Sequence, residues 1–294
     1  MQPYVIFTDA GADIPAQLCE KYDLRGIPMN YMLNGQEETF RPEDPDRDAL
    51  CTAFYEKLRQ QATVSTSQIT PYLFEAAFLP VLEAGQDILY CCFSSGMSST
   101  WQNLQVVLAE LTERFPERTL RCVDSRSASG GEGLIALQAA VNREKGLSLS
   151  DNAAWLETRI PQVCHWFTVN DLDFLKRGGR ISPTVAFLGG KLQIKPVLVI
   201  GEDGKLIVSE KARGRKASIQ ALLKHYSAAL DFGDAQPAVF ISHAGAPEEA
   251  AALADAVQQL SPAGTEVYIS ELSPIIGAHT GPDMLAVCHY GTHR

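Results

Sequence analysis

The first half of the chain alternates apolar runs with amphipathic stretches. Residues 4–8 and 87–93 are almost entirely apolar, which is typical of parallel strands that are covered on both faces. Leu50, Phe54 and Leu58 recur every four residues, which predicts a helix over residues 46–61. This alternation predicts an α/β domain with a parallel, doubly wound sheet. We expect strands at 4–8, 87–93 and 120–123, and helices at 14–22, 46–61, 71–85, 99–115 and 132–144.

The second half has a different pattern, in which strands dominate. Residues 195–200 and 206–210 flank the turn Glu202-Asp203-Gly204, which predicts an antiparallel hairpin. We expect an α+β domain with a mixed or largely antiparallel sheet, and we place the boundary near residue 160, so that the domains are 1–160 and 161–294. Further strands are expected at 164–169, 238–242, 267–271 and 284–289, and helices at 170–179, 216–230 and 247–260.

Residues 26–45 interrupt the pattern of the first half. They are rich in Gly, Pro, Asn and Glu, and Asn34-Gly35 is a signal for a hairpin turn. We therefore expect a small β insertion in the first domain. Residues 275–282 form another Gly-rich stretch between two expected strands, and we interpret it as a loop.

The amino-acid composition and net charge argue against several classes of protein. The chain has 294 residues, 46% of them apolar, and a net charge of −10, which argues against nucleic acid as a general partner. No apolar run approaches the length of a membrane span. The N-terminus lacks the features of a signal peptide, so we expect a cytoplasmic protein. Seven cysteines without a CxxC pair indicate neither a disulfide framework nor a zinc site, and we expect no metal and no cofactor.

The charge is unevenly distributed along the chain. Residues 176–216 carry ten Lys or Arg and three acidic residues, or +7, so the remainder carries −17. A basic island on an acidic protein is suited to an acidic partner or a phosphate. A solvated face explains the same residues equally well. A regulator that binds a phosphorylated metabolite through this island is therefore one hypothesis for the function.

Four loops that follow expected strands are rich in hydroxyl groups. They cover residues 8–13, 63–70, 94–100 and 124–131. Any one of them is explained by helix capping, since Ser and Thr are common caps. Because several of these loops open helices at one edge of the sheet, together they favour a site for an anionic ligand.

Two residues stand out as candidates for chemistry. Ser98 lies in Gly96-Met97-Ser98-Ser99-Thr100, which lacks the last glycine of the nucleophile elbow of serine hydrolases. A serine-dependent acyl hydrolase or transferase that uses Ser98 therefore stays open as the alternative function. His279, in the stretch read as a loop, could donate a hydrogen bond to a carboxylate or cap a turn.

An ordered set of short segments resembles the DegV family of fatty-acid-binding proteins and spans nearly the whole chain. Each segment is weak alone, but the order is specific. The segments are Thr8-Asp9-Ala10-Gly11-Ala12-Asp13-Ile14, Thr66-Ser67-Gln68, Ser98-Ser99-Thr100-Trp101-Gln102, Val123-Asp124-Ser125, Leu175-Lys176-Arg177-Gly178-Gly179-Arg180-Ile181, Gly190-Lys191-Leu192 with Lys195-Pro196, Ala212-Arg213-Gly214-Arg215-Lys216-Ala217 and Ile276-Gly277-Ala278-His279-Thr280-Gly281-Pro282.

The resemblance implies a binding protein that catalyses nothing by itself. Family members hold a long-chain fatty acid in a tunnel between two domains, and the residues that match their carboxylate contacts are Thr66 and Ser98, with His279 nearby. We expect Asp9, Ser67 and Ser99 to support this site. The family's usual residues at positions 10 and 99 are Ser and Gly, whereas this chain has Ala10 and Ser99.

The resemblance also implies a partner. Some members present the bound acid to a separate ATP-dependent fatty-acid kinase subunit, which makes the acyl phosphate. We expect the basic island to form the docking face for such a subunit. The docking residues expected there are Arg177, Arg180, Arg213 and Arg215.

Overall fold

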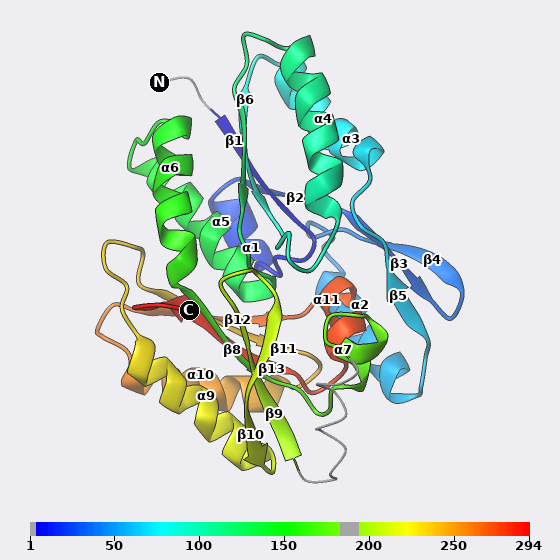
Figure 1. Ribbon diagram of the computed structural model, residues 1–294, viewed down its shortest axis with the longest axis vertical. Helices are drawn as coiled ribbons and strands as arrows, with labels where there is room; N and C mark the ends of the chain where they lie inside the picture. Colours follow the sequence, from blue (N-terminus) through cyan, green and yellow to red (C-terminus); the bar gives the residue numbers. More distant parts are fainter. Residues whose placement is uncertain (1–3, 183–193) are drawn as a thin grey trace.

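The computed structural model describes residues 4–182 and 194–294 (Figure 1). The segment Gly190-Lys191-Leu192 lies outside these residues. The first half forms a parallel four-stranded sheet in the order β2-β1-β6-β7. Every residue of β1 and β6 is buried, as their apolar sequences predict. The strands are β1 (Tyr4–Asp9), β2 (Leu24–Ile27), β6 (Asp87–Cys92) and β7 (Leu120–Asp124).

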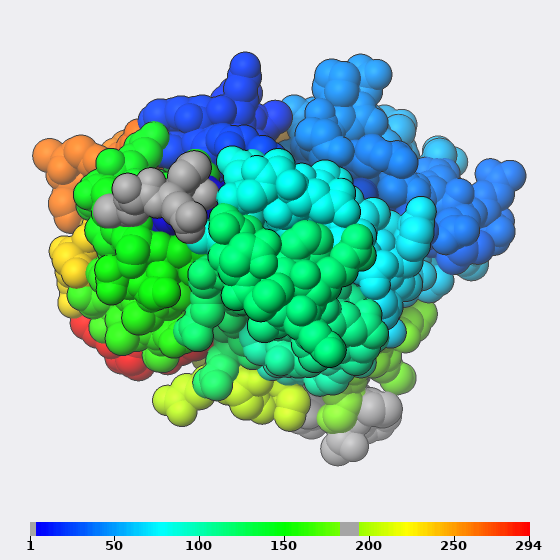
Figure 2. All heavy atoms as spheres, turned by 90° about the horizontal axis from the view of Figure 1, so that it is seen from above, coloured from blue at the N-terminus to red at the C-terminus, as the bar shows by residue number. Residues whose placement is uncertain are grey.

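Helices cover both faces of this sheet, so the prediction of a doubly wound parallel sheet is confirmed. Helices α3 (Pro71–Glu83) and α4 (Thr100–Arg114) lie side by side on one face (Figures 1 and 2). Thr70 caps α3, and its side chain accepts a hydrogen bond from the backbone N–H of Leu73. The other face is covered by α1 (Ala16–Lys21), α5 (Ser129–Glu144) and α6 (Leu149–Arg159).

A three-stranded antiparallel sheet projects to one side of the molecule (Figures 1 and 2). Asn34 and Gly35 both have positive φ angles at the turn between β3 (Met29–Leu33) and β4 (Gln36–Phe40), as the hairpin signal predicts. The third strand, β5 (Val64–Thr66), is an element that we did not expect. It pairs Thr66 with Tyr31, and helix α2 (Arg47–Arg59) connects β4 to it.

The second half forms a six-stranded mixed sheet in the order β10-β9-β8-β13-β11-β12, as predicted. Only β11 and β12 are parallel; the other neighbours are antiparallel. Its strands are β8 (Val163–Thr168), β9 (Ile194–Ile200), β10 (Leu206–Arg213), β11 (Ala238–His243), β12 (Glu266–Glu271) and β13 (Leu285–Tyr290). Its helices within the described residues are η1 (Ile160–Gln162), α7 (Asp173–Arg177), α9 (Arg215–Ala229), α10 (Pro247–Leu260) and α11 (Pro274–Thr280).

Helix α5 lies between the two large sheets. It packs against β1 and β6 on one side and against β8, β11 and β13 on the other, and all its residues from Ser129 to Asn142 are buried. A helix that is buried all round belongs to the interior of a fold. The apolar core is continuous from the first sheet through α5 to the inner face of the second sheet. The division at residue 160 therefore stays a prediction.

The interpretation of residues 275–282 as a loop is wrong, because most of them form helix α11. Pro274 occupies its first turn, where the missing N–H costs nothing. Gly277 lies inside the helix because a Cβ at this position would come 2.3 Å from the hydroxyl of Tyr55. The glycine that weakens the helical pattern in the sequence is thus required by packing.

Candidate ligand-binding site

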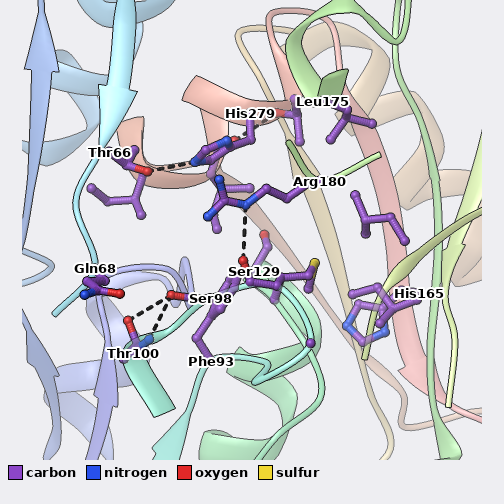
Figure 3. Close-up of a pocket in the computed structure, with 18 of the residues that line it drawn as sticks. Thr66, Gln68, Phe93, Ser98, Thr100, Ser129, His165, Leu175, Arg180 and His279 are labelled. Atoms are coloured by element: carbon purple, nitrogen blue, oxygen red, sulfur yellow. Dashed lines mark hydrogen bonds between the residues drawn. The ribbon is translucent and has the colours of Figure 1, made fainter. Parts of the chain in front are cut away.

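A cavity of about 700 Å³ lies between the carboxyl edge of the parallel sheet and the inner face of the mixed sheet (Figure 3). Its volume is within the range of small-molecule sites. One wall consists of the loops after β5, β6 and β7, and the other of α7, α11 and strands of the mixed sheet. Its apolar lining residues are Met29, Phe93, Met97, Ala128, Phe167, Leu175, Ile200, Leu206, Ile275, Ile276, Met284 and Ala286.

Thr66 and His279 meet at one end of this cavity. The Thr66 hydroxyl lies 2.7 Å from Nε2 of His279 (Figure 3). Burial, together with the positive charge of Arg180, lowers the pKa of His279 to about 4, so the ring is neutral at pH 7. Its Nδ1 faces Gly178, where a Cβ would come within 2.2 Å of that nitrogen. The Gly178 position therefore allows the close approach that keeps His279 beside Thr66.

Ser98 lies at the start of α4, across from this pair. Its hydroxyl donates to Oγ1 of Thr100 (3.0 Å) and accepts from the backbone N–H of Thr100 (3.2 Å). Thr100 Oγ1 also accepts from the backbone N–H of Ile69 (3.2 Å). The Ser98 loop is thereby tied to the segment that carries Thr66, so the structure brings all three predicted carboxylate contacts to one cavity.

Arg180 supplies the positive charge of the cavity. It lines the wall next to His279 (Figure 3), and its Nε donates to the carbonyl of Met97 (3.2 Å). A second guanidinium nitrogen donates to the carbonyl of Gly178. We had expected Arg180 in a docking face, so sequence reasoning missed its place in the site, together with the lining residues Gln68 and Thr100. The sequence signal is Gly178-Gly179, which ends α7 with Gly179 at a positive φ angle directly before Arg180.

The three supporting residues have different roles. Ser67 and Ser99 are exposed and contribute to the lining. Asp9 is buried outside the lining, and its carboxylate accepts hydrogen bonds from the N–H groups of Gly11 (2.8 Å) and Phe93 (3.1 Å) and from the hydroxyl of Tyr90 (3.2 Å). Burial raises the pKa of Asp9. Asp9 therefore holds the loop that leads to Ser98 and does not reach the cavity itself.

The other three arginines that we expected in a docking face differ in their exposure and in their partners. Arg177 is exposed and its guanidinium lies 4.3 Å from the ring centroid of Phe174. Arg213 is also exposed. Arg215 forms a two-pronged ion pair with Glu249, with a shortest distance of 2.6 Å. Of the four expected docking residues, only Arg177 and Arg213 present their charge freely to solvent.

The geometry around Ser98 does not form a nucleophile and base pair. Within residues 4–182 and 194–294, the hydrogen bonds of its hydroxyl are made with Thr100, and His279 is bonded to Thr66. A serine nucleophile is activated by a base within hydrogen-bond reach. The described site instead offers hydroxyls, a neutral imidazole and a guanidinium, which together suit the binding of an anion.

The family model described as "Uncharacterised protein, DegV family" matches residues 3–292. The chain belongs to the DegV family. A DegV domain-containing protein of Clostridium perfringens is 35% identical over 291 residues, which cover 99% of this chain and 98% of that protein.

Solved DegV structures have the same fold. A DegV family protein from Thermus thermophilus, described as binding fatty acid, superposes with a TM-score of 0.84 at 29% identity and covers 99% of this chain and 100% of its own. DegV of Bacillus subtilis, described as a fatty acid binding protein, gives 0.80 at 27% identity, with coverage of 98% and 99%. In the part of the chain that the structure describes, no helix combines the length and apolarity needed to cross a bilayer.

The two departures from the DegV segments lie at different depths. Ala10 is buried and does not line the cavity. Ser99 is exposed and directly precedes α4. The Ala10 departure therefore leaves the lining itself unchanged, whereas Ser99 adds a hydroxyl beside Ser98.

Proposed function

We propose that this chain binds a long-chain fatty acid, with the carboxylate among Thr66, Ser98, His279 and Arg180 and the tail along the apolar lining. The observation that carries the proposal is a cavity that is lined by two hydroxyls, a neutral imidazole and a guanidinium, while most of the remaining lining is apolar. The solved DegV relatives described as binding fatty acids support the same class of ligand.

The energetics fit an amphipathic acid. Burying an ionised carboxylate without partners is prohibitive. Hydrogen bonds to a charged group contribute roughly 1.5–3 kcal/mol each. Each buried methylene adds about 0.8 kcal/mol, so a sixteen-carbon chain contributes on the order of 10 kcal/mol before the entropic costs of binding. Tight binding then follows without any catalytic group.

The matched test compares two adjacent hydroxyls on β5. Thr66 lines the cavity, whereas Ser65 is exposed and does not line it. Thr66→Val and Ser98→Ala should each weaken palmitate binding to lipid-free protein at least tenfold in calorimetry, because an under-satisfied charge remains. Ser65→Val should leave the affinity within about twofold. Unchanged affinity in both site variants would exclude this carboxylate site.

The alternative enzyme function has its own test. Ester turnover by the purified protein that disappears in Ser98→Ala would replace the carrier proposal with a hydrolase. Native mass spectrometry that detects a co-purified fatty acid of intact mass would favour the carrier.

We further infer that the bound acid is presented to an ATP-dependent kinase subunit, which docks through Arg177 and Arg213. Both residues are exposed and unpaired with acidic side chains among the described residues, so they can steer an acidic partner. Arg180 and Arg215 are left out of this face, because one lines the cavity and the other is paired with Glu249.

The docking proposal is tested by charge reversal. Arg177→Glu with Arg213→Glu should abolish acyl-phosphate formation in an assay coupled to the kinase subunit, while palmitate affinity stays within about twofold. The control, Lys57→Glu with Lys145→Glu, changes the net charge equally at two other exposed lysines and should retain coupling. If lipid binding falls in step with coupling, the two arginines belong to the ligand site.

A further inference from the structure

A second set of polar side chains also lines the cavity. His165 lies on the side opposite Thr66 and Gln68, and Ser129 lies between His165 and Ser98 (Figure 3). His165 on β8 and Ser129 at the start of α5 both contribute to the lining, and each is only 5% exposed. Cys288 on β13 lies directly opposite His165 in the sheet and also lines the cavity. These residues interrupt a lining that is otherwise apolar in this region.

His165 lacks the partners that a buried imidazole normally has. Within the described residues, neither of its ring nitrogens makes a hydrogen bond of normal geometry. Burial lowers the pKa of His165 well below its usual value and outweighs the nearby carbonyls of Val163 and Ala128, which favour the protonated ring. The side chain is therefore a neutral group with one donor and one acceptor.

The position of the ring is fixed by the structure around it. A Cβ at Gly131, in the first turn of α5, would come 1.7 Å from Nε2 of His165, so only glycine there leaves room for the imidazole. Ser129 Oγ donates to Ser242 Oγ over 3.3 Å, which is a long hydrogen bond. The Ser129 hydroxyl keeps lone pairs that can accept a hydrogen bond, and it lies in the cavity lining between Ser98 and His165.

Unpaired buried polar atoms are costly, at roughly 1–3 kcal/mol each, and nearly all such atoms in folded proteins have a partner. A polar occupant of the cavity would remove this cost. The charges nearby indicate that this occupant is neutral. The cation that most affects the pKa of His165 is Arg294. Its guanidinium already donates hydrogen bonds to the carbonyls of Ser125, Arg126 and Gly201 and to the Ser127 hydroxyl. The ring of His165 is itself uncharged, so it has no positive charge with which to offset an anion.

We propose that His165, with Ser129, forms a second polar subsite that selects acyl chains carrying a neutral hydrogen-bonding group, a hydroxyl or a keto oxygen, away from the carboxylate. This inference rests on the proposed fatty-acid function. The carboxylate end anchors the ligand, and the subsite distinguishes acyl chains that carry a hydroxyl or a keto oxygen from chains that carry neither. An unsubstituted chain leaves the imidazole unpaired, whereas a hydroxyl at the matching carbon can either donate to its unprotonated nitrogen or accept from its N–H.

The test measures a ratio of affinities. Stearate and a series of monohydroxystearates, with the hydroxyl at carbons 2 to 17, are titrated into lipid-free protein. We expect at least one positional isomer with a mid-chain or distal hydroxyl to bind about five- to tenfold tighter than stearate. In His165→Phe this ratio should fall to about one, and in His165→Gln, which keeps a donor and an acceptor, a preference should remain.

The control variant acts at the other end of the ligand. His279→Gln should weaken stearate and the preferred hydroxystearate equally and so leave their ratio unchanged. If stearate binds but no isomer binds tighter, or if the preference survives in His165→Phe, the subsite is overturned while the carboxylate site stands. If no acid of either kind binds to the unaltered protein, the proposed function itself fails.

Discussion

The two walls of the cavity are built in different ways. The wall from the first half consists of the end of β5, the segment after it and the loops at the carboxyl edge of the parallel sheet, and it supplies Thr66, Gln68, Ser98 and Thr100. The wall from the second half includes strands whose alternate residues face the cavity: His165 and Phe167 on β8 lie opposite Cys288 and Ala286 on β13. The loop wall thus supplies most of the hydrogen-bonding groups, and the strands supply shape.

This difference sets what each wall needs in order to stay in place. A loop has no ladder of backbone hydrogen bonds, so its backbone groups need other partners. Asp9 provides such partners for Gly11 and Phe93. The strand wall is held by its sheet and by an apolar layer behind it, in which Leu285 and Val287 pack with residues of α9 and α10. Changes in the two walls should therefore have different consequences.

The largest effect is expected from Asp9→Ala, which removes the anchor of the loop wall. Two backbone N–H groups and the Tyr90 hydroxyl lose their acceptor, at a cost of about 3 kcal/mol in the free energy of unfolding. Urea denaturation measures this loss, and calorimetry should show a parallel loss of ligand affinity. Asp9→Asn keeps one oxygen acceptor and should lose less than half as much. Stability equal to that of the unaltered protein would show that the loop is held by other contacts.

Ala286→Leu should affect the strand wall in the opposite way. Ala286 is buried and lines the cavity, so the larger side chain has empty space to enter. We expect stability within about 1 kcal/mol of the unaltered protein but palmitate affinity at least tenfold lower, which is about 1.4 kcal/mol. Ala286→Gly, which adds no volume, is the matched variant and should retain binding. A large loss of stability in Ala286→Leu would mean that this wall cannot accept volume.

His279 links the two walls and should make stability depend on pH. Its pKa is about 4 in the folded protein and about 6.5 when unfolded, so the unfolded chain binds more protons between these values. Stability from the neutral ring is complete above pH 6.5 and is lost as the pH falls toward 4. Relative to His279→Gln, the protein should lose about 1 kcal/mol between pH 7.5 and 5.5. Parallel stability curves for the two proteins would contradict the lowered pKa.

The smallest effect is expected from Arg180→Gln, which removes the positive charge beside His279. The guanidinium of Arg180 helps to hold the pKa of His279 down, so Arg180→Gln should raise that pKa. NMR titration of the His279 ring measures the change directly. Arg177→Gln, a change on the exposed side of the same segment, should leave the titration unaltered. A pKa of His279 that does not move in Arg180→Gln would indicate that burial alone sets it.

The sequence predicted the loop wall better than the strand wall. Ser98 follows a strand of the parallel sheet, in agreement with the rule that strand ends meet at one sheet edge. Thr66 ends β5 of the separate three-stranded sheet, so only the resemblance placed it in the same site. Helix α11 was missed because Gly277 is dictated by its contact with Tyr55, which is more than two hundred residues away. His165 has no local signal at all: its role depends on Gly131 and on the cavity beside β13. Residues that are defined by a distant neighbour cannot be recovered from local patterns.

Helix α5 has a consequence for how this molecule can be divided and recombined. One side of α5 contacts β1 of the parallel sheet, and the opposite side contacts β11 and β13 of the mixed sheet. Each half of the chain therefore supplies part of the surface that buries this helix. A fragment that ends near residue 160 would expose the side that belongs to the second sheet. A chimera that joins the halves of two relatives would pair this helix with an unfamiliar partner. Swaps between relatives should therefore carry α5 together with the inner residues of β11 and β13, as a single exchangeable unit.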